Sequence, residues 1–191
     1  EEKVCHYLDV PIQHASDRIL KRMGRRTNQA QLREIIGKLR AAVPDIAIRT
    51  TMISGFPGET QEDHEEVMRF VDEMEFERLG VFTYSAEEDT PAAAFPDQIP
   101  EEVKEARRDE IMELQQEISY DLNAKKVGQE LCVIVDGYIY KDDMYTCRSY
   151  MDAPDIDGLV FVHSDEELLS GDYINVRITD FNEYDLIGER I

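Results

Sequence analysis

Cysteine is scarce in this sequence, which contains three in 191 residues: Cys5, Cys132 and Cys147. Their odd number and wide spacing provide neither a disulfide framework nor a C-x-x-C metal pair. Histidine pairs with metal-ligand spacing are lacking as well. We therefore expect free thiols in a reducing compartment, a cytoplasmic protein, and no metal site within this chain.

Long apolar runs are also missing. No segment approaches the about 18 consecutive apolar residues of a membrane helix, which excludes an integral membrane protein of that type. No signal peptide is visible either, because the charged opening leads almost at once into the strand-like run 4–10. Such an opening is typical of the middle of a domain, and we expect the chain to be a fragment.

Basic residues are few relative to acidic ones. The chain carries 21 Lys and Arg against 42 Asp and Glu, a formal net charge of -21, and residues 121–191 alone have 16 acidic and 6 basic side chains. Nucleic-acid binding needs clustered cations, so nucleic acid is not expected as the main partner. The acidic field favours a basic protein partner, and solubility alone remains the alternative.

The most informative segment that is present is the glycine turn Gly55-Phe56-Pro57-Gly58. It follows a β-rich run at 46–53 and precedes an amphipathic helix that Thr60 can cap. In parallel α/β folds, ligands bind at the carboxyl ends of strands, and a turn without bulky side chains permits close approach. An ordinary strand-to-helix connection is the alternative interpretation.

Residues 1–96 alternate between strand and helix patterns, which predicts parallel βαβ units. Strands are expected at 4–10, 46–53 and 79–84. Ser16 is the expected cap of a short helix, and Thr27 is expected to open a second helix. That second helix has one apolar stripe, formed by Leu32, Ile35, Ile36 and Leu39.

The pattern changes after residue 96. A long helix is expected at 100–126, with a stripe that includes Val103, Ala106, Ile111 and Ile118. Beyond Gly128 the hydrophobic period becomes two, with short strand candidates at 131–135, 138–140, 145–148, 159–162 and 173–178, and a further edge strand at 186–191. About five short strands suit a small closed barrel. We therefore expect three parts, 1–96, 97–126 and 127–191.

Several motifs occur in a fixed order along the chain. They are YLDVPIQHAS at 7–16, MGRR at 23–26, RTT at 49–51, GFPGET at 55–60, LGVFTYS at 79–85 and RSYMDAPDIDG at 148–158. In these motifs the chain resembles the C-terminal portion of the radical S-adenosylmethionine (SAM) methylthiotransferases. The run at 152–158 resembles the branch that modifies a ribosomal protein, rather than the branch that modifies tRNA.

The resemblance implies an α/β fold: the later half of a partial (βα)6 barrel, followed by a small all-β, OB-like TRAM barrel for substrate docking. It implies SAM as cofactor and two 4Fe-4S clusters in the intact parent enzyme. It also implies transfer of a methylthio group to the β-carbon of an aspartate in a small-subunit ribosomal protein. The cluster motif C-x-x-x-C-x-x-C is absent here, so the fragment is expected to be inactive alone.

The resemblance also suggests which residues bind the cofactor. Gln13 lies just past a strand, and Arg25 matches a family arginine whose guanidinium can bind a carboxylate. The other residues expected to contact SAM are Ile53, Gly55, Pro57, Gly58, Tyr84 and Ser85. For Arg25 a solvated helix end, and for Tyr84 a place in the core, remain alternatives. The catalytic residues are unknown.

In the second half, three acids crowd one loop around Pro154: Asp152, Asp155 and Asp157. They lack EF-hand spacing, so a docking surface for a basic ribosomal protein is preferred over a calcium site. Arg148 is expected to fix this loop. A solvated acidic turn is the alternative. A tRNA methylthiotransferase and a non-catalytic module that binds a basic protein remain rival functions.

Overall fold

The computed structural model describes residues 3–191, and the chain divides into two compact units. One unit is Leu8–Gln115, and the other is Gln116–Ile191 with the residues up to Tyr7. The division falls within one long helix. No helix within residues 3–191 combines the length and the apolar character needed to cross a membrane.

The first unit contains a three-stranded sheet in the order β1-β2-β3. Its strands are β1 (Tyr7–Asp9), β2 (Ala47–Ser54) and β3 (Arg78–Thr83). β2 and β3 are parallel, from Arg49 opposite Arg78 to Ser54 opposite Thr83. β1 is shorter than the expected run at 4–10, but its continuation at Gln13 forms a parallel bridge to Met52 of the central strand.

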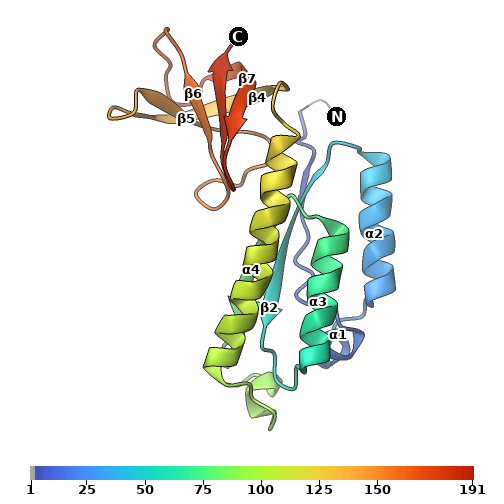
Figure 1. Cartoon of the computed structure of the whole chain (residues 1–191). Helices are drawn as coiled ribbons and strands as arrows, with labels where there is room; N and C mark the ends of the chain where they lie inside the picture. Colours follow the sequence, from blue (N-terminus) through green and yellow to red (C-terminus); the bar gives the residue numbers. More distant parts are fainter. Residues whose placement is uncertain (1–2) are drawn as a thin grey trace. The chain divides into compact units, whose positions relative to one another are not determined.

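Four α-helices belong wholly or partly to this unit: α1 (Asp17–Arg22), α2 (Gln29–Ala42), α3 (Gln61–Met74) and α4 (Glu101–Ala124). α3 lies between α2 and α4 (Figure 1), with Arg33 paired to Glu73 on one side and His64 bonded to Glu110 on the other. A short 3-10 turn, η1 (Pro91–Ala94), follows β3. This arrangement confirms the predicted strand–helix alternation.

Helix starts are set by capping boxes. Thr60 caps α3 as predicted, exchanging hydrogen bonds with Asp63. The prediction that Thr27 opens α2 is wrong by one residue, because Asn28 accepts from the backbone of Gln31 and the Gln31 side chain accepts from the backbone of Asn28. In the predicted stripe of α2, Leu32 and Ile36 are buried, but Ile35 is 42% exposed.

α4 differs from expectation in the character of its buried face. Ile111 and Ile118 are buried as predicted, whereas Ala106 is exposed. The remaining buried residues of the helix are polar or charged: Lys104, Arg107, Gln115, Ser119 and Asn123. Together with Ile111, which lies between Arg107 and Gln115, these positions recur every three or four residues, so α4 presents a largely polar stripe to the protein interior.

The second unit contains a closed barrel in the order β4-β5-β6-β8-β7. Its strands are β4 (Glu130–Ile139), β5 (Met144–Arg148), β6 (Val160–His163), β7 (Tyr173–Phe181) and β8 (Leu186–Arg190). The barrel interior contains Val133, Val135, Val160, Val162 and Val176, all nearly inaccessible to solvent.

Two strand predictions in the barrel need correction. The segment 138–140 is not a separate strand, because it continues β4 across a bulge between Val135 and Gly137. β8 is not an edge, because it pairs with β6 in parallel and with β7 antiparallel, which closes the barrel. The predicted fold class, an α/β portion with a parallel sheet followed by a small β-barrel, is confirmed.

Candidate functional site

The glycine turn after β2 is tightly packed. Gly55 and Gly58 have φ of 72° and 82°, a region that favours glycine. A Cβ on Gly55 would lie 2.2 Å from Cγ of Lys104, and one on Gly58 would lie 3.0 Å from Arg22 and Asp97. The space that the glycines leave open is therefore occupied by side chains of the protein itself.

Glu59 stabilises this turn through hydrogen bonds of its buried carboxylate. Its carboxylate accepts the N–H of Gly55 at 2.9 Å and is paired with Arg107 at 2.8 Å and His14 at 3.2 Å. Burial by itself would raise the pKa of Glu59, but the hydrogen bond from His14 and the charge of Arg107 outweigh it and hold the pKa below its ordinary value. The carboxylate is therefore an ionised structural anchor of the turn.

The tautomer of His14 follows from its two contacts. The backbone N–H of Ser16 donates to Nδ1 at 2.9 Å, so Nδ1 carries no proton. Nε2 then bears the hydrogen and donates to Glu59. His14 is thus a neutral linker between the loop after β1 and the turn after β2, and it holds its neighbour Gln13 in place.

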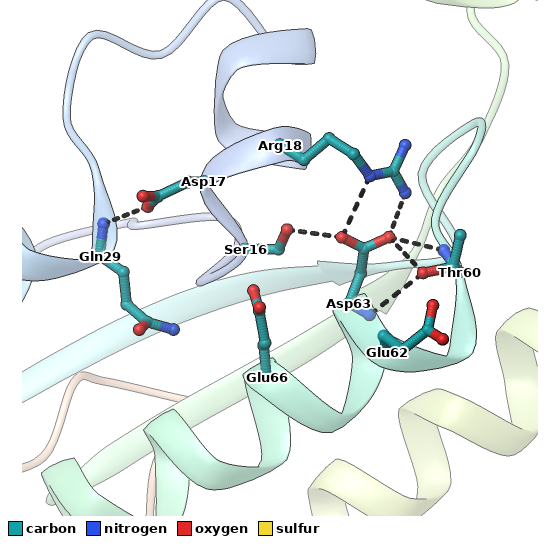
Figure 2. A pocket seen from close by; sticks show the side chains of 8 residues that line it. All are labelled: Ser16, Asp17, Arg18, Gln29, Thr60, Glu62, Asp63 and Glu66. Carbon is teal, nitrogen blue, oxygen red and sulfur yellow. Dashed lines mark hydrogen bonds and ion pairs between the residues drawn. The ribbon is translucent and has the colours of Figure 1, made fainter.

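Asp63 is a second polar anchor (Figure 2). It accepts hydrogen bonds from Ser16 Oγ at 2.6 Å and Thr60 N at 2.7 Å, and it is paired with Arg18. Burial opposes ionisation, but these donors, led by Arg18, lower the pKa of Asp63 well below its usual range. Because its oxygens are engaged, Asp63 ties α1 to α3 rather than offering a free base.

Figure 2 also shows the hollow beside Asp63, of about 430 Å³. Glu62 and Glu66 of α3 and Asp17 of α1 line it, and the Asp17 carboxylate accepts the backbone N–H of Gln29. None of the residues expected to bind a cofactor or substrate lies here.

A second hollow, of about 480 Å³, gathers part of the expected cofactor site. Gln13, Arg25 and Ile53 all line it. The other lining residues are Arg22, Met23, Gly24, Phe56, Thr90, Pro91, Ala92 and Phe95. Its volume is within the range of small-molecule sites, and its lining includes two arginines and no acid.

The walls of this hollow are largely apolar. The rings of Phe56 and Phe95 meet edge to face at 6.2 Å between centroids. The guanidinium of Arg22 lies 4.6 Å from the centre of the Phe95 ring and pairs with Asp97 at 2.9 Å. Arg25 is exposed and supplies the other positive charge. Such a lining suits a ligand with an apolar or aromatic body and a carboxylate.

The backbone of Gln13 is held in an unusual conformation at the edge of this hollow. Its φ is 71°, in the left-handed region that residues other than glycine rarely adopt. Its N–H donates to Thr51 O at 2.9 Å, and its carbonyl accepts from Ile53 N at 2.8 Å. Strain maintained by the surrounding structure is more frequent at functional positions, so it supports a role for Gln13.

The remaining expected cofactor residues lie outside this lining. Gly55, Pro57 and Gly58 form the packed turn, and Ser85 is exposed after β3. Tyr84 is buried, with its ring 5.2 Å from that of Phe56, and its carbonyl accepts from Lys104 Nζ at 2.8 Å.

Eight lining residues were not among the residues expected to bind the cofactor: Arg22, Met23, Gly24, Phe56, Thr90, Pro91, Ala92 and Phe95. Phe56 has a sequence signal, because it lies within the glycine turn Gly55-Phe56-Pro57-Gly58. Pro91 and Phe95 belong to a segment after β3. No sequence pattern indicates that this segment lies beside Gln13 and Ile53 in the hollow.

The acidic loop of the barrel is partly used for its own folding. Asp152 is buried and accepts from Ser149 Oγ at 2.6 Å, and Asp157 accepts from Ala153 N at 2.9 Å. Asp155 is exposed, with φ of 60°. Arg148 forms two hydrogen bonds with Asp136 of β4, at 2.7 and 3.1 Å.

The cysteines do not form a metal site. Cys5 and Cys132 are exposed, whereas Cys147 is buried in the barrel. Burial, with a smaller contribution from Asp136, raises the pKa of Cys147 to about 12. Within residues 3–191, no group of three or more His, Cys, Asp or Glu side chains could hold a metal ion. The described residues therefore do not fit an iron–sulfur cluster.

Two sequence families match parts of this chain. The radical SAM superfamily matches residues 1–71, and the TRAM domain matches residues 127–191. Similar proteins extend across both parts. A protein of Lachnoclostridium phytofermentans is 58% identical over 188 residues, which are 98% of this chain and 43% of that protein. It is named ribosomal protein uS12 methylthiotransferase RimO.

The chain belongs to the radical SAM methylthiotransferase family. Proteins with the same name from Thermoanaerobacter sp. and Geobacter sulfurreducens are each 50% identical, over 98% and 100% of this chain and 42% and 43% of their own lengths. The resemblance inferred from the motifs is confirmed. This chain spans less than half the length of these relatives.

Membership of this family makes SAM the implied cofactor. The chemistry of the hollow around Gln13 and Arg25 suits SAM. Its aromatic walls can pack against the adenine base, and a guanidinium can bind the carboxylate. The individual contacts remain predictions, because the site residues were assigned by resemblance.

Proposed function

We propose that this chain is part of a methylthiotransferase that adds a methylthio group to the β-carbon of an aspartate in a basic small-subunit ribosomal protein. One observation carries the proposal: 48–58% identity over at least 98% of the chain to proteins named for action on ribosomal protein uS12. The acidic charge of the chain supports a basic partner.

The first unit would hold the cofactor. Gln13, Arg25 and Ile53 would contact SAM directly, with Arg25 on its carboxylate. Gly55, Pro57, Gly58, Tyr84 and Ser85 complete the proposed cofactor-binding set. When bound, SAM supplies one-electron chemistry and a methyl group. The residues of the chain bind it, orient it and exclude water.

The anchors behind the hollow would keep this geometry. Glu59, neutral His14 and Arg107 connect the loop that carries Gln13 with the turn after β2 and with α4. Because the network is buried, a small change in it would shift Gln13 relative to Ile53. These three residues therefore position the site and do not touch the reacting atoms.

We propose that the isolated chain is inactive. The two 4Fe-4S clusters of the intact parent would have their ligands outside this sequence. Anaerobic reconstitution with iron and sulfide should therefore leave the chain with substoichiometric iron and without the absorption of a 4Fe-4S cluster. A stoichiometric cluster would contradict this proposal.

The barrel would dock the ribosomal protein. Asp155 is the exposed acid of the loop, and Asp152 and Asp157 shape it through internal bonds. Arg148, which precedes the loop, would belong to the docking surface while its side chain is bonded to Asp136 of β4. We also propose three functional parts, 1–96, 97–126 and 127–191, and a cytoplasmic location, where a ribosomal substrate is made.

One binding experiment separates this function from its rivals. The chain is titrated with ribosomal protein uS12 and, separately, with tRNA across a series of salt concentrations. We expect binding of the protein, weakening as salt rises, and no tight binding of tRNA. Tight, salt-sensitive binding of tRNA would favour a tRNA methylthiotransferase and overturn the proposal.

A second measurement tests catalysis in the longer parent protein. After incubation with SAM, reductant and uS12, the substrate should gain one methylthio group on an aspartate, as read by peptide mass spectrometry. Binding of uS12 without this modification would leave a non-catalytic docking protein. The two experiments together distinguish the enzyme from the binding module.

A further inference from the structure

Three tyrosines line one face of the β4–β5 hairpin. Tyr138 of β4 lies directly opposite Tyr145 of β5, with ring centroids 4.8 Å apart. Tyr140, which directly follows the last residue of β4, meets Tyr138 edge to face at 5.0 Å. Tyr140 is 89% exposed, more than any other large apolar or aromatic side chain for which exposure is described. We call Tyr138, Tyr140 and Tyr145 the tyrosine ladder.

Two of the three rings, those of Tyr138 and Tyr145, are held in place through their hydroxyl groups. The hydroxyl of Tyr138 donates to the carboxylate of Asp143, which lies at the hairpin tip with φ of 54°. The hydroxyl of Tyr145 accepts the backbone N–H of Leu168 at 3.1 Å. These two rings are therefore ordered before a partner arrives, and Tyr140 packs against one of them, which lowers the entropic cost of binding.

Asp143 also affects the electronic state of the ladder. Its hydrogen bond raises the pKa of Tyr138 to about 12, so this phenol stays protonated at neutral pH. A phenol that donates to a carboxylate has a more electron-rich ring, and such a ring attracts cations more strongly.

The surroundings of the ladder are acidic. Residues 127–191 contain 15 acidic and 4 basic side chains. The hairpin itself carries four acids, Glu130, Asp136, Asp142 and Asp143, against two basic residues, Lys141 and Arg148, and Arg148 is paired with Asp136. Aromatic rings on OB-like barrels commonly stack on nucleic-acid bases, but phosphates require nearby cations. The charge around the ladder therefore favours a cationic occupant.

We propose that the tyrosine ladder is a docking surface for an arginine- or lysine-rich segment of a basic protein. Guanidinium or ammonium groups would lie over the exposed ring faces, with the neighbouring aspartates adding long-range attraction. This inference rests on the proposed function only in taking the partner to be a basic protein.

The ladder is separate from the acidic loop at 152–157. β5 begins at Met144, beside the ladder and the hairpin tip, and ends at Arg148, from which the chain enters that loop. The two surfaces thus lie at opposite ends of one strand. A long basic segment can engage both, and each can be tested by its own substitution.

The test uses the chain as it is, with a fluorescently labelled arginine-rich peptide as the probe. Tyr140→Ala should weaken peptide binding about two- to fivefold, the effect of one exposed cation–π contact. Tyr140→Phe, which keeps the ring, should bind like the original chain. Tyr184→Ala is the matched control, because Tyr184 is a half-exposed tyrosine in the β7–β8 turn, outside the ladder.

Two results would overturn the proposal. The first is unchanged peptide affinity in Tyr140→Ala, or an equal loss in Tyr184→Ala. The second is that a labelled oligouridylate binds more tightly than the peptide, and that Tyr140→Ala lowers the affinity for this RNA but not the affinity for the peptide. Peptide binding needs no cofactor. If the peptide does not bind, the methylthiotransferase assay of the parent protein can still succeed, so the two results are independent.

Discussion

At the scale of single residues, the charges beneath the glycine turn are the most consequential feature. Glu59 and Arg107 are both buried and oppositely charged, with neutral His14 between the carboxylate and the loop after β1. Breaking a buried pair usually costs more than the pair contributes, because the remaining charge is left without compensation.

Glu59→Gln should therefore lower the free energy of unfolding by about 3 kcal/mol, through the uncompensated guanidinium of Arg107. Urea denaturation followed by circular dichroism measures this. Glu73→Gln, which removes an exposed pair with Arg33, should change the free energy by less than about 1 kcal/mol. Equal losses in both variants would mean that burial does not determine the importance of the pair.

The same residue makes a prediction about pH. The pKa of Glu59 is lower in the folded than in the unfolded chain, so its contribution to stability is present above the unfolded value and is lost as the pH falls through the folded one. Asp63 acts in the same direction. Stability should therefore decline on acidification below about pH 4.5, and less steeply in Glu59→Gln than in the original chain.

The thiols provide a further residue-scale prediction. Cys5 and Cys132 are exposed, whereas Cys147 is buried with its pKa raised to about 12. A thiolate-selective reagent should therefore modify two cysteines of the folded chain quickly and the third only after unfolding. Mass spectrometry of timed samples shows which sites react. Rapid modification of Cys147 in the folded chain would contradict the buried position.

At the scale of elements, the junction of β2, the glycine turn and α4 is tightly packed. Gly55→Ala should destabilise the chain by several kcal/mol, because a Cβ would lie 2.2 Å from the Lys104 side chain at a φ of 72°. Thermal unfolding measures the loss.

Two glycines serve as controls for this substitution. Gly24→Ala has the same positive φ but no atom within 4 Å, so it isolates the conformational cost, about 1 kcal/mol. Gly37 lies in the middle of α2 with open space around it, and Gly37→Ala should stabilise the helix by about 0.5–1 kcal/mol. If Gly55→Ala cost no more than Gly24→Ala, the contact with Lys104 would not matter.

Elements were predicted well where local chemistry defines them. The cap at Thr60 of α3 and the buried residues Leu32 and Ile36 of α2 follow directly from the sequence pattern. The polar buried face of α4 could not be predicted, because Lys104 and Arg107 carry the charges of an exposed face. They are buried because Tyr84 O and the Glu59 carboxylate, distant in sequence, accept their hydrogen bonds.

At the scale of the whole molecule, the net charge of -21 dominates. Like charges repel one another in the compact state more than in the expanded one. Adding NaCl from low to physiological concentration at pH 7 should therefore raise the urea midpoint, since screening relieves the repulsion. A lower midpoint would show that the screened ion pairs matter more than the overall charge.

The sequence by itself determined the family, the α/β-then-barrel order, the free thiols and the acidic character. These properties depend on local periodicity, composition and ordered motifs, which need no knowledge of distant contacts. It also placed Gln13, Arg25 and Ile53 in one candidate site.

Only the tertiary structure decided what surrounds those residues. It showed that the Lys104 side chain fills the space beside Gly55 in the glycine turn. It also showed that segment 90–95 lines the hollow and that three tyrosines meet on one hairpin face. Each of these results depends on which distant residue fills a given space. Packing and charge compensation settle that choice across many residues at once, so it leaves no local sequence signal.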